Sequence, residues 1–167
     1  MPDVSAETAY LFRHALLRDA AYQLQPPRER AALHTSVVEI IEELDDSNLE
    51  TFALELAEHA RLAGPENARM KERELRYLRL GYDYSRRVYA NEDALRCLRG
   101  IIGHPEVEPR SRVESRIELA RLLAVVGDND RSLSGCRACV KDVDEPDALM
   151  IQAPTRLGIR LFADAPP

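Results

Sequence analysis

Apolar residues recur every three or four positions along almost the whole chain, and this spacing is the feature that most restricts its fold. One turn of an α-helix takes ~3.6 residues, so this spacing places the apolar side chains on one face of a helix. The alternation of apolar and polar residues that is typical of half-buried strands hardly occurs. The sequence therefore predicts an all-α protein without a β-sheet.

Pro, Gly, Asp and Asn divide this pattern into eight short segments, because these residues favour helix ends and turns. The pair Pro26-Pro27 separates the first two helices, and Gly64-Pro65 closes the third. The turn "DDSN" is expected to cap the third helix, and Asn91 to cap the fifth. The expected helices cover residues 8–24, 27–44, 49–63, 67–89, 91–102, 110–126, 129–140 and 148–162, the last one interrupted by a proline.

A length of 167 residues suits one domain with a substantial core. We expect residues 1–167 to form a single helical-repeat domain. Within it, residues 8–64 are the N-terminal helices, residues 67–146 are two similar units, and residues 147–167 are a truncated final helix.

The two similar units become visible when the chain is aligned with itself at an offset of 38 residues. The alignment pairs Leu78 with Arg116, Gly81 with Leu119, Tyr82 with Ala120, Ala94 with Ser132, Leu98 with Cys136 and Ile101 with Cys139. A first helix with large and then small residues, followed by a second helix with small residues at the close contact, resembles the tetratricopeptide repeat. Repeats of that family have about 34 residues, so about four extra residues are assigned to the loop "GHPEVEP". The resemblance implies a right-handed superhelical stack of antiparallel helix pairs with about seven or eight helices.

A second resemblance concerns the order of the segments "FRHALLRDAAY", "RERAALH", "ALELAEHARLAG" and "YLRLGYDYSRRVYANEDALRCLRGI". This order is similar to the helical region that follows the P-loop ATPase and winged-helix modules of bacterial STAND-type signal-transduction ATPases. Such ATPases are associated with adenylate cyclase, kinase or LuxR-type DNA-binding domains. The likeness spans Phe12 to Ile102, and the repeat units extend it to about Pro146. It implies a regulatory arm that contacts a partner protein or another domain of the same polypeptide.

Composition and missing motifs exclude several classes of function. None of the seven glycines is followed by Lys, so the phosphate-binding loop of an ATPase is absent and no nucleotide hydrolysis is predicted. The net charge of −6 disfavours direct binding to nucleic acid. No apolar run reaches the length needed to span a bilayer, and the first residues do not resemble a signal peptide. We therefore expect a cytoplasmic protein that neither contacts a membrane nor needs a cofactor.

Cysteines and histidines are the remaining candidates for chemistry. Cys136 and Cys139 form a CxxC motif, whose alternatives are thiol redox chemistry or half of a zinc site completed by Cys97 and His104. The repeat alignment favours buried packing thiols instead, because both cysteines occupy positions of apolar residues in the preceding unit. His14 and His34 lie beside apolar stripes, where a structural hydrogen bond across a helix contact is the favoured interpretation. Glu55 and His59 form a further i, i+4 pair, to which the same structural interpretation applies.

Charge is distributed unevenly along the chain. Residues 39–58 contain eight acids and no base, whereas residues 69–87 contain seven bases and three acids. Arg76, Arg79, Asp83 and Arg86 share one helix face at the spacing i, i+3, i+7 and i+10. The resemblance to tetratricopeptide repeats implies that this face lines a concave groove. The predicted groove residues are Arg76, Arg79, Asp83, Arg86 and Arg121. The groove interpretation predicts binding of an acidic peptide or a carboxylate terminus, whereas the alternative is a solvated face that pairs with the acidic helices.

The sequence thus predicts a non-catalytic protein–protein interaction module of a larger bacterial signalling protein. The first alternative is an intramolecular spacer that separates an ATPase from its effector domain. The second is a metal or redox protein based on the cysteines. A homodimer formed through apolar faces at truncated helix ends is a further expected association.

Overall fold

The structure is a computed structural model that describes residues 15–44, 48–64 and 66–141, and it describes only the backbone of residues 15–18 and 136–141. In these ranges the chain is helical apart from turns, which confirms the all-α class. The expected eighth helix, over residues 148–162, lies outside the described residues. The helices are α1 (Ala15–Leu24), α2 (Pro27–Leu44), α3 (Ala53–Leu62), α4 (Ala68–Arg87), α5 (Asn91–Gly103), α6 (Pro109–Val125) and α7 (Asn129–Lys141).

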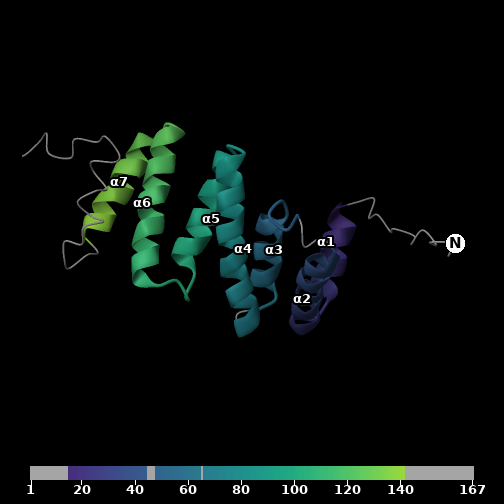
Figure 1. Cartoon of the computed structure of the whole chain (residues 1–167). Helices are drawn as coiled ribbons and strands as arrows, with labels where there is room; N and C mark the ends of the chain where they lie inside the picture. The colour runs from purple at the N-terminus through teal and green to yellow at the C-terminus, as the bar shows by residue number, and fades with distance from the viewer. Residues whose placement is uncertain (1–14, 45–47, 65, 142–167) are drawn as a thin grey trace, which may run out of the picture.

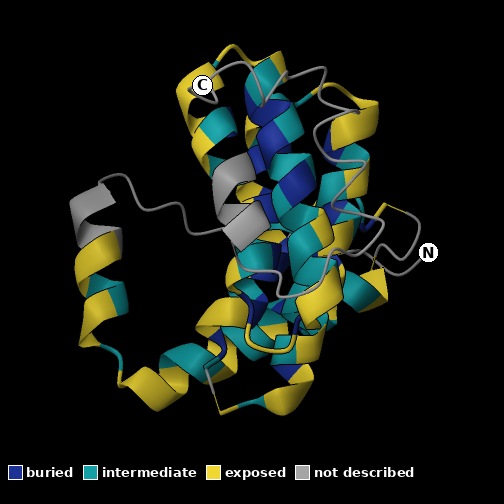
Figure 2. Ribbon diagram, turned by 90° about the vertical axis from the view of Figure 1, so that its left-hand side faces the viewer, coloured by how far each residue is buried: buried dark blue, intermediate teal, exposed yellow. Residues whose placement is uncertain are grey.

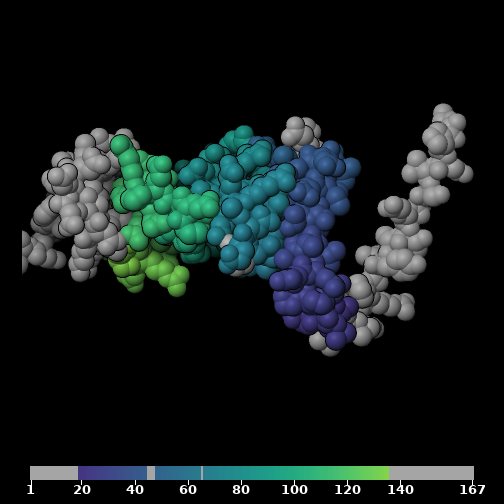
Figure 3. All heavy atoms as spheres, turned by 90° about the horizontal axis from the view of Figure 1, so that it is seen from below, coloured from purple at the N-terminus to yellow at the C-terminus, as the bar shows by residue number. Residues whose placement is uncertain are grey.

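The helices stand side by side in the order of the chain (Figure 1). From α2 to α7, each helix packs on the next, most extensively where α4 lies between α3 and α5. Seen from below, this row is an elongated body with α1 and α2 at one end (Figure 3). The right-handed superhelical stack stays a prediction.

Several helix ends follow directly from local sequence. Pro27 occupies the first position of α2, where proline needs no hydrogen-bond partner for its nitrogen. The Asn67 side chain caps α4 by accepting a hydrogen bond from the backbone N–H of Met70 at 3.2 Å. Gly64 follows α3 with a φ of +110°, a left-handed conformation that glycine adopts without strain. The predicted end of the third helix is therefore confirmed.

Two predicted helix starts are wrong. The third helix does not extend to Leu49: residues 48–51 form a turn, α3 begins at Ala53, and no side chain caps it at Phe52. The turn places Leu49 in the core, which a helical start would not require. Asn91 is not a cap but the first residue of α5, because the preceding turn places Ala90 at the capping position.

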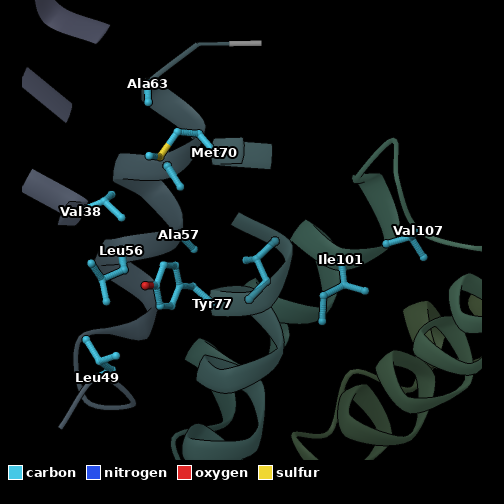
Figure 4. Packing of buried hydrophobic residues seen from close by; sticks show 11 residues of the cluster. Val38, Leu49, Leu56, Ala57, Ala63, Met70, Tyr77, Ile101 and Val107 are labelled. Atoms are coloured by element: carbon cyan, nitrogen blue, oxygen red, sulfur yellow. The ribbon is translucent and has the colours of Figure 1, made fainter. Parts of the chain in front are cut away.

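The main core lies between α2, α3, α4 and α5 (Figure 4). Tyr77 of α4 is fully buried in this cluster, together with apolar residues that include Leu56, Met70 and Ile101. A second, smaller cluster joins α5 to α6 and contains Leu95, Leu98, Leu122 and Leu123. Figure 2 shows the buried residues as a band along the helix contacts. The helix α2 contributes only Val38 to the fully buried set, so its attachment depends more on polar contacts.

The pairs α4–α5 and α6–α7 have the spacing that the self-alignment predicts. The helix α5 begins at Asn91 and α7 at Asn129, 38 residues later, and both have 13 residues. The aligned small residues Ala94 and Ser132 are both buried, at 0% and 1% exposure. The hydroxyl of Ser132 also donates to the carbonyl of Ala120 at 2.8 Å, which joins α7 to α6. The second helices of the two pairs therefore correspond in length and spacing, whereas the first helices, α4 and α6, have 20 and 17 residues. The division into two repeat units and their membership of the tetratricopeptide family stay predictions.

None of the helices within the described ranges combines the length and the apolar composition needed to cross a membrane.

Candidate functional site

An open groove of about 280 Å³ lies where α4 and α6 flank α5. Leu98 and Ile101 of α5 contribute apolar side chains to it. The polar lining comes from the first helix of each pair: Arg79, Tyr82 and Asp83 of α4, and Glu114 and Glu118 of α6. The groove therefore lies between α4 and α6, the first helices of the two pairs.

The structure brings together only part of the predicted groove set. Arg79 and Asp83 line the groove, whereas Arg76 and Arg86 are exposed residues outside its lining. The Arg76 guanidinium instead lies 5.5 Å from the centre of the Tyr77 ring. Arg121 forms an ion pair with Glu118. The groove thus carries both signs of charge, and its role in binding stays a prediction.

The charges within the groove differ in how far they are already paired. Glu118 faces Arg121, and Glu114 pairs with Arg110 at 3.4 Å. Within the part of the chain that the structure describes, Arg79 forms no ion pair. Burial raises the pKa of the Tyr82 hydroxyl, and the negative charge of Glu118 raises it further. Tyr82 therefore stays a neutral hydroxyl, and Arg79 is the cation available to a ligand.

Sequence reasoning did not assign Tyr82, Glu114 or Glu118 to this groove. The spacing of residues along a helix shows which of them share a face. It does not show which face of α6 turns toward α4. The 38-residue offset would not have found Glu118 either, since it pairs Glu118 with Leu80, which does not line the groove.

The uneven charge along the chain has a structural role at other positions. Arg73 of α4 pairs with Glu42 of α2 at 2.8 Å, and Arg69 pairs with Glu39 at 3.3 Å. The Tyr77 hydroxyl also donates to the Glu42 carboxylate, and burial together with this bond raises the pKa of Tyr77. Two arginines of α4 thus pair with the acidic second helix, but neither belongs to the predicted groove set, so the choice between the groove and the solvated face stays open.

Histidines form a chain of hydrogen bonds across three helices. Nδ1 of His34 lies 2.8 Å from Nδ1 of His59, which joins α2 to α3. Nε2 of His34 lies 2.9 Å from the Tyr22 hydroxyl on α1. The predicted structural role of His34 across a helix contact is confirmed, whereas His14 lies outside the described residues. Sequence reasoning connected His59 only with Glu55, because nothing local shows that it meets a residue 25 positions earlier.

The cysteine alternatives receive no support from the described side chains. Burial raises the pKa of the Cys97 thiol to about 11, which disfavours the reactive thiolate. The side chains of Cys136 and Cys139 lie outside the described residues. In the described part of the chain, no three His, Cys, Asp or Glu side chains lie close enough together to hold a metal ion.

Comparison with protein-family models, with curated proteins and with solved structures gives no match. The resemblance to the helical region of STAND-type ATPases therefore stays a prediction, and the properties of the groove rest on this chain alone.

Proposed function

We propose that this protein is a non-catalytic interaction module that binds a peptide segment of a partner protein in the groove between α4 and α6. The observation that carries the proposal is the groove itself, with Arg79 unpaired beside Tyr82 and two apolar side chains. The apolar residues offer contact area, while Arg79 can hold a carboxylate in a bidentate pair. The proposed location is the cytoplasm, a reducing compartment, because three cysteines are an odd and small number that does not suggest a disulfide framework.

The acidic lining of α6 refines the expected ligand. Glu118 and Glu114 already have arginine partners, yet their carboxylates face the groove together with Asp83. A uniformly acidic peptide would meet repulsion from these groups. We therefore expect a peptide with an acidic group opposite Arg79 and a basic or polar residue opposite α6.

A peptide library displayed on phage and selected on the folded chain tests the proposal. Affinities of the selected peptides are measured by fluorescence anisotropy for the wild type and for Arg79→Glu. Reversing the charge of Arg79 is expected to weaken binding by about tenfold or more, because a charge-assisted pair becomes a repulsion. The matched control is Arg76→Glu, since Arg76 lies on the same helix but outside the groove lining.

Two results would overturn this assignment. One is a selection that yields no peptide above background. The other is an affinity that Arg79→Glu leaves unchanged, which would move the binding surface elsewhere. The circular-dichroism melts of both variants should match that of the wild type, because Arg76 and Arg79 are exposed.

Exposed apolar side chains on α1 and α2 favour a second candidate function, the intramolecular spacer. Leu24 and Leu44 are 85% and 79% exposed, and Leu33 and Ile40 are each 52% exposed. Apolar surface of this kind often marks a contact with another domain. In a longer parent protein, Leu33→Glu combined with Ile40→Glu would then raise the basal output of the effector domain. Unchanged output would refute the spacer function.

A further inference from the structure

A second cavity, of about 360 Å³, lies between α3, α4 and α5 and the loop that follows α5. It is separate from the groove, and none of the residues that line it also lines the groove. Its charged and titratable lining consists of Arg61, Lys71, Glu74, Arg99 and His104. No part of the proposed interaction function uses these residues.

His104 lines this cavity and carries a buried hydrogen-bond donor. The backbone N–H of Glu106 donates to Nδ1 of His104 at 3.2 Å, so Nε2 carries the proton of the neutral ring. The His104 side chain is only 2% exposed, and its Nε2 has no hydrogen-bond partner among the described residues. The nearest acidic oxygen, Oε2 of Glu74, is 3.8 Å away and beyond hydrogen-bond distance. The Nε2–H group is therefore a buried donor without a partner on a residue that lines the cavity.

The residues around this donor are mainly basic. Arg61 is already bound by both carboxylate oxygens of Glu58, at 2.9 and 2.5 Å. Lys71 and Arg99 form no ion pair with any described residue. Glu74 is the single acid in the described lining, and burial raises the pKa of its carboxyl. Two unpaired cations and one buried donor thus surround the same space.

Helix ends account for only some of these cations. The helices α3 and α5 end at Leu62 and Gly103, beside the cavity, and basic side chains stabilise the partial negative charge of helix C-termini. Such stabilisation explains Arg61, which lies in the last turn of α3, whereas the last turn of α5 carries no basic residue and Arg99 lies before it. Lys71 instead lies at the start of α4, where the partial charge is positive, and α4 has no acid in its first turn. The positive charge of Lys71 near the positive end of α4 destabilises the helix, and a bound anion offsets this repulsion.

We propose that this cavity binds a small free oxyanion, a carboxylate or phosphate compound. One of its oxygens accepts a hydrogen bond from Nε2–H of His104, and its charge lies between Lys71 and Arg99. Arg112 holds the loop that presents His104, because its guanidinium donates to the carbonyls of His104 at 3.0 Å and Val107 at 3.2 Å. The donor is thus positioned before the anion arrives.

Titration of the full chain with inorganic phosphate, and separately with succinate, tests the proposal. Sodium chloride keeps the ionic strength constant, and ¹H–¹⁵N NMR follows the ring nitrogens of His104. At least one of the two anions is expected to shift the Nε2 resonance in a saturable manner, and the one that binds more tightly identifies the class of ligand. Lys71→Ala and Arg99→Ala should each weaken binding by about tenfold, since each removes a charge-assisted contact.

Arg96→Ala is the matched control, because Arg96 lies on α5 near Arg99 but pairs with Asp93 and does not line the cavity. The affinity of Arg96→Ala for the anion should equal that of the wild type. Lys71→Gln is a second test variant, which removes the charge but keeps most of the side-chain length. The proposal fails if neither anion produces a saturable shift, or if the Lys71 and Arg99 variants bind as tightly as the wild type. Arg79→Glu should leave anion binding unchanged, so this test and the peptide test fail independently.

Discussion

At the scale of single residues, the clearest departure from local rules is Tyr89, at the end of α4. It has a φ of +60° and is 85% exposed, in a position where helices commonly carry glycine. The backbone N–H of Ala90 returns to the carbonyl of Ser85 at 2.9 Å and closes the helix end around it. A left-handed conformation costs a residue with a side chain about 1–2 kcal/mol, so Tyr89 is locally unfavourable.

Tyr89→Gly is therefore expected to stabilise the fold. The gain should be about 0.5–1 kcal/mol, because the greater freedom of glycine in the unfolded chain offsets part of the relieved strain. Denaturant unfolding measures this change, with Val88→Gly as a control that replaces an exposed neighbour with a negative φ. The control should not gain stability. A loss of stability in Tyr89→Gly would show that the aromatic ring makes a compensating contact.

A second residue-scale prediction concerns the Tyr77 hydroxyl, which donates to Glu42 from within the main core. Tyr77→Phe keeps the ring and removes only this bond to a charged group. The free energy of unfolding should fall by about 1.5–3 kcal/mol, measured by urea denaturation. Tyr84→Phe is the control, as Tyr84 lies on the same helix and is only partly buried. Equal losses in both variants would contradict the assigned role of the hydrogen bond.

At the scale of elements, the hydrogen bonds of His34 make the packing of α1 and α2 on α3 sensitive to pH. Only one proton can lie between the two Nδ1 atoms of His34 and His59. The pKa of His34 is lowered, first by burial and then by His59, while Glu58 opposes the shift and Arg30 adds to it. Among the described residues, the Tyr22 hydroxyl also faces the ring, at 2.9 Å from Nε2. The unfolded chain therefore takes up the proton at a higher pH than the folded chain does.

The stability that this histidine contributes is consequently complete above a pH of about 6.5 and is lost as the pH falls below it. Urea unfolding of the wild type at pH 7.5 and at pH 5.5 should show a lower free energy at the acidic pH. His34→Gln should reduce this difference, because glutamine does not titrate. A pH dependence that is equally steep in His34→Gln would assign the effect to other groups.

At the scale of the whole molecule, the row of helices has one large cluster between α2 and α5 and a smaller one between α5 and α6. In such a row each helix contacts mainly its neighbours, so a local defect is felt mostly nearby. Leu56→Ala removes a fully buried side chain of the large cluster and should cost about 2–5 kcal/mol. Hydrogen exchange should then accelerate more in α2–α5 than in α6. Uniform acceleration would show that the described helices unfold as one unit.

Local sequence determined the helices, because a helix is specified by the spacing of its own apolar residues and by its own turn residues. The ends at Gly64 and Pro27 and the 38-residue spacing of the two helix pairs were predictable for this reason. The start of α3 was not, since the burial of Leu49 in a turn depends on the core that it fills.

The tertiary structure alone decided which side chains meet, because rotation of one helix against another is determined by packing between distant segments. Packing places Arg79 in the groove lining and Arg76 outside it. It also forms the ion pair between Arg73 and Glu42 and the hydrogen bond between His34 and His59. Packing also places Lys71, Arg99 and His104 along one cavity, a juxtaposition that no spacing in the sequence indicates. The sequence by itself therefore determined an all-α chain of paired helices, and long-range packing decided where its charges and its buried donor converge.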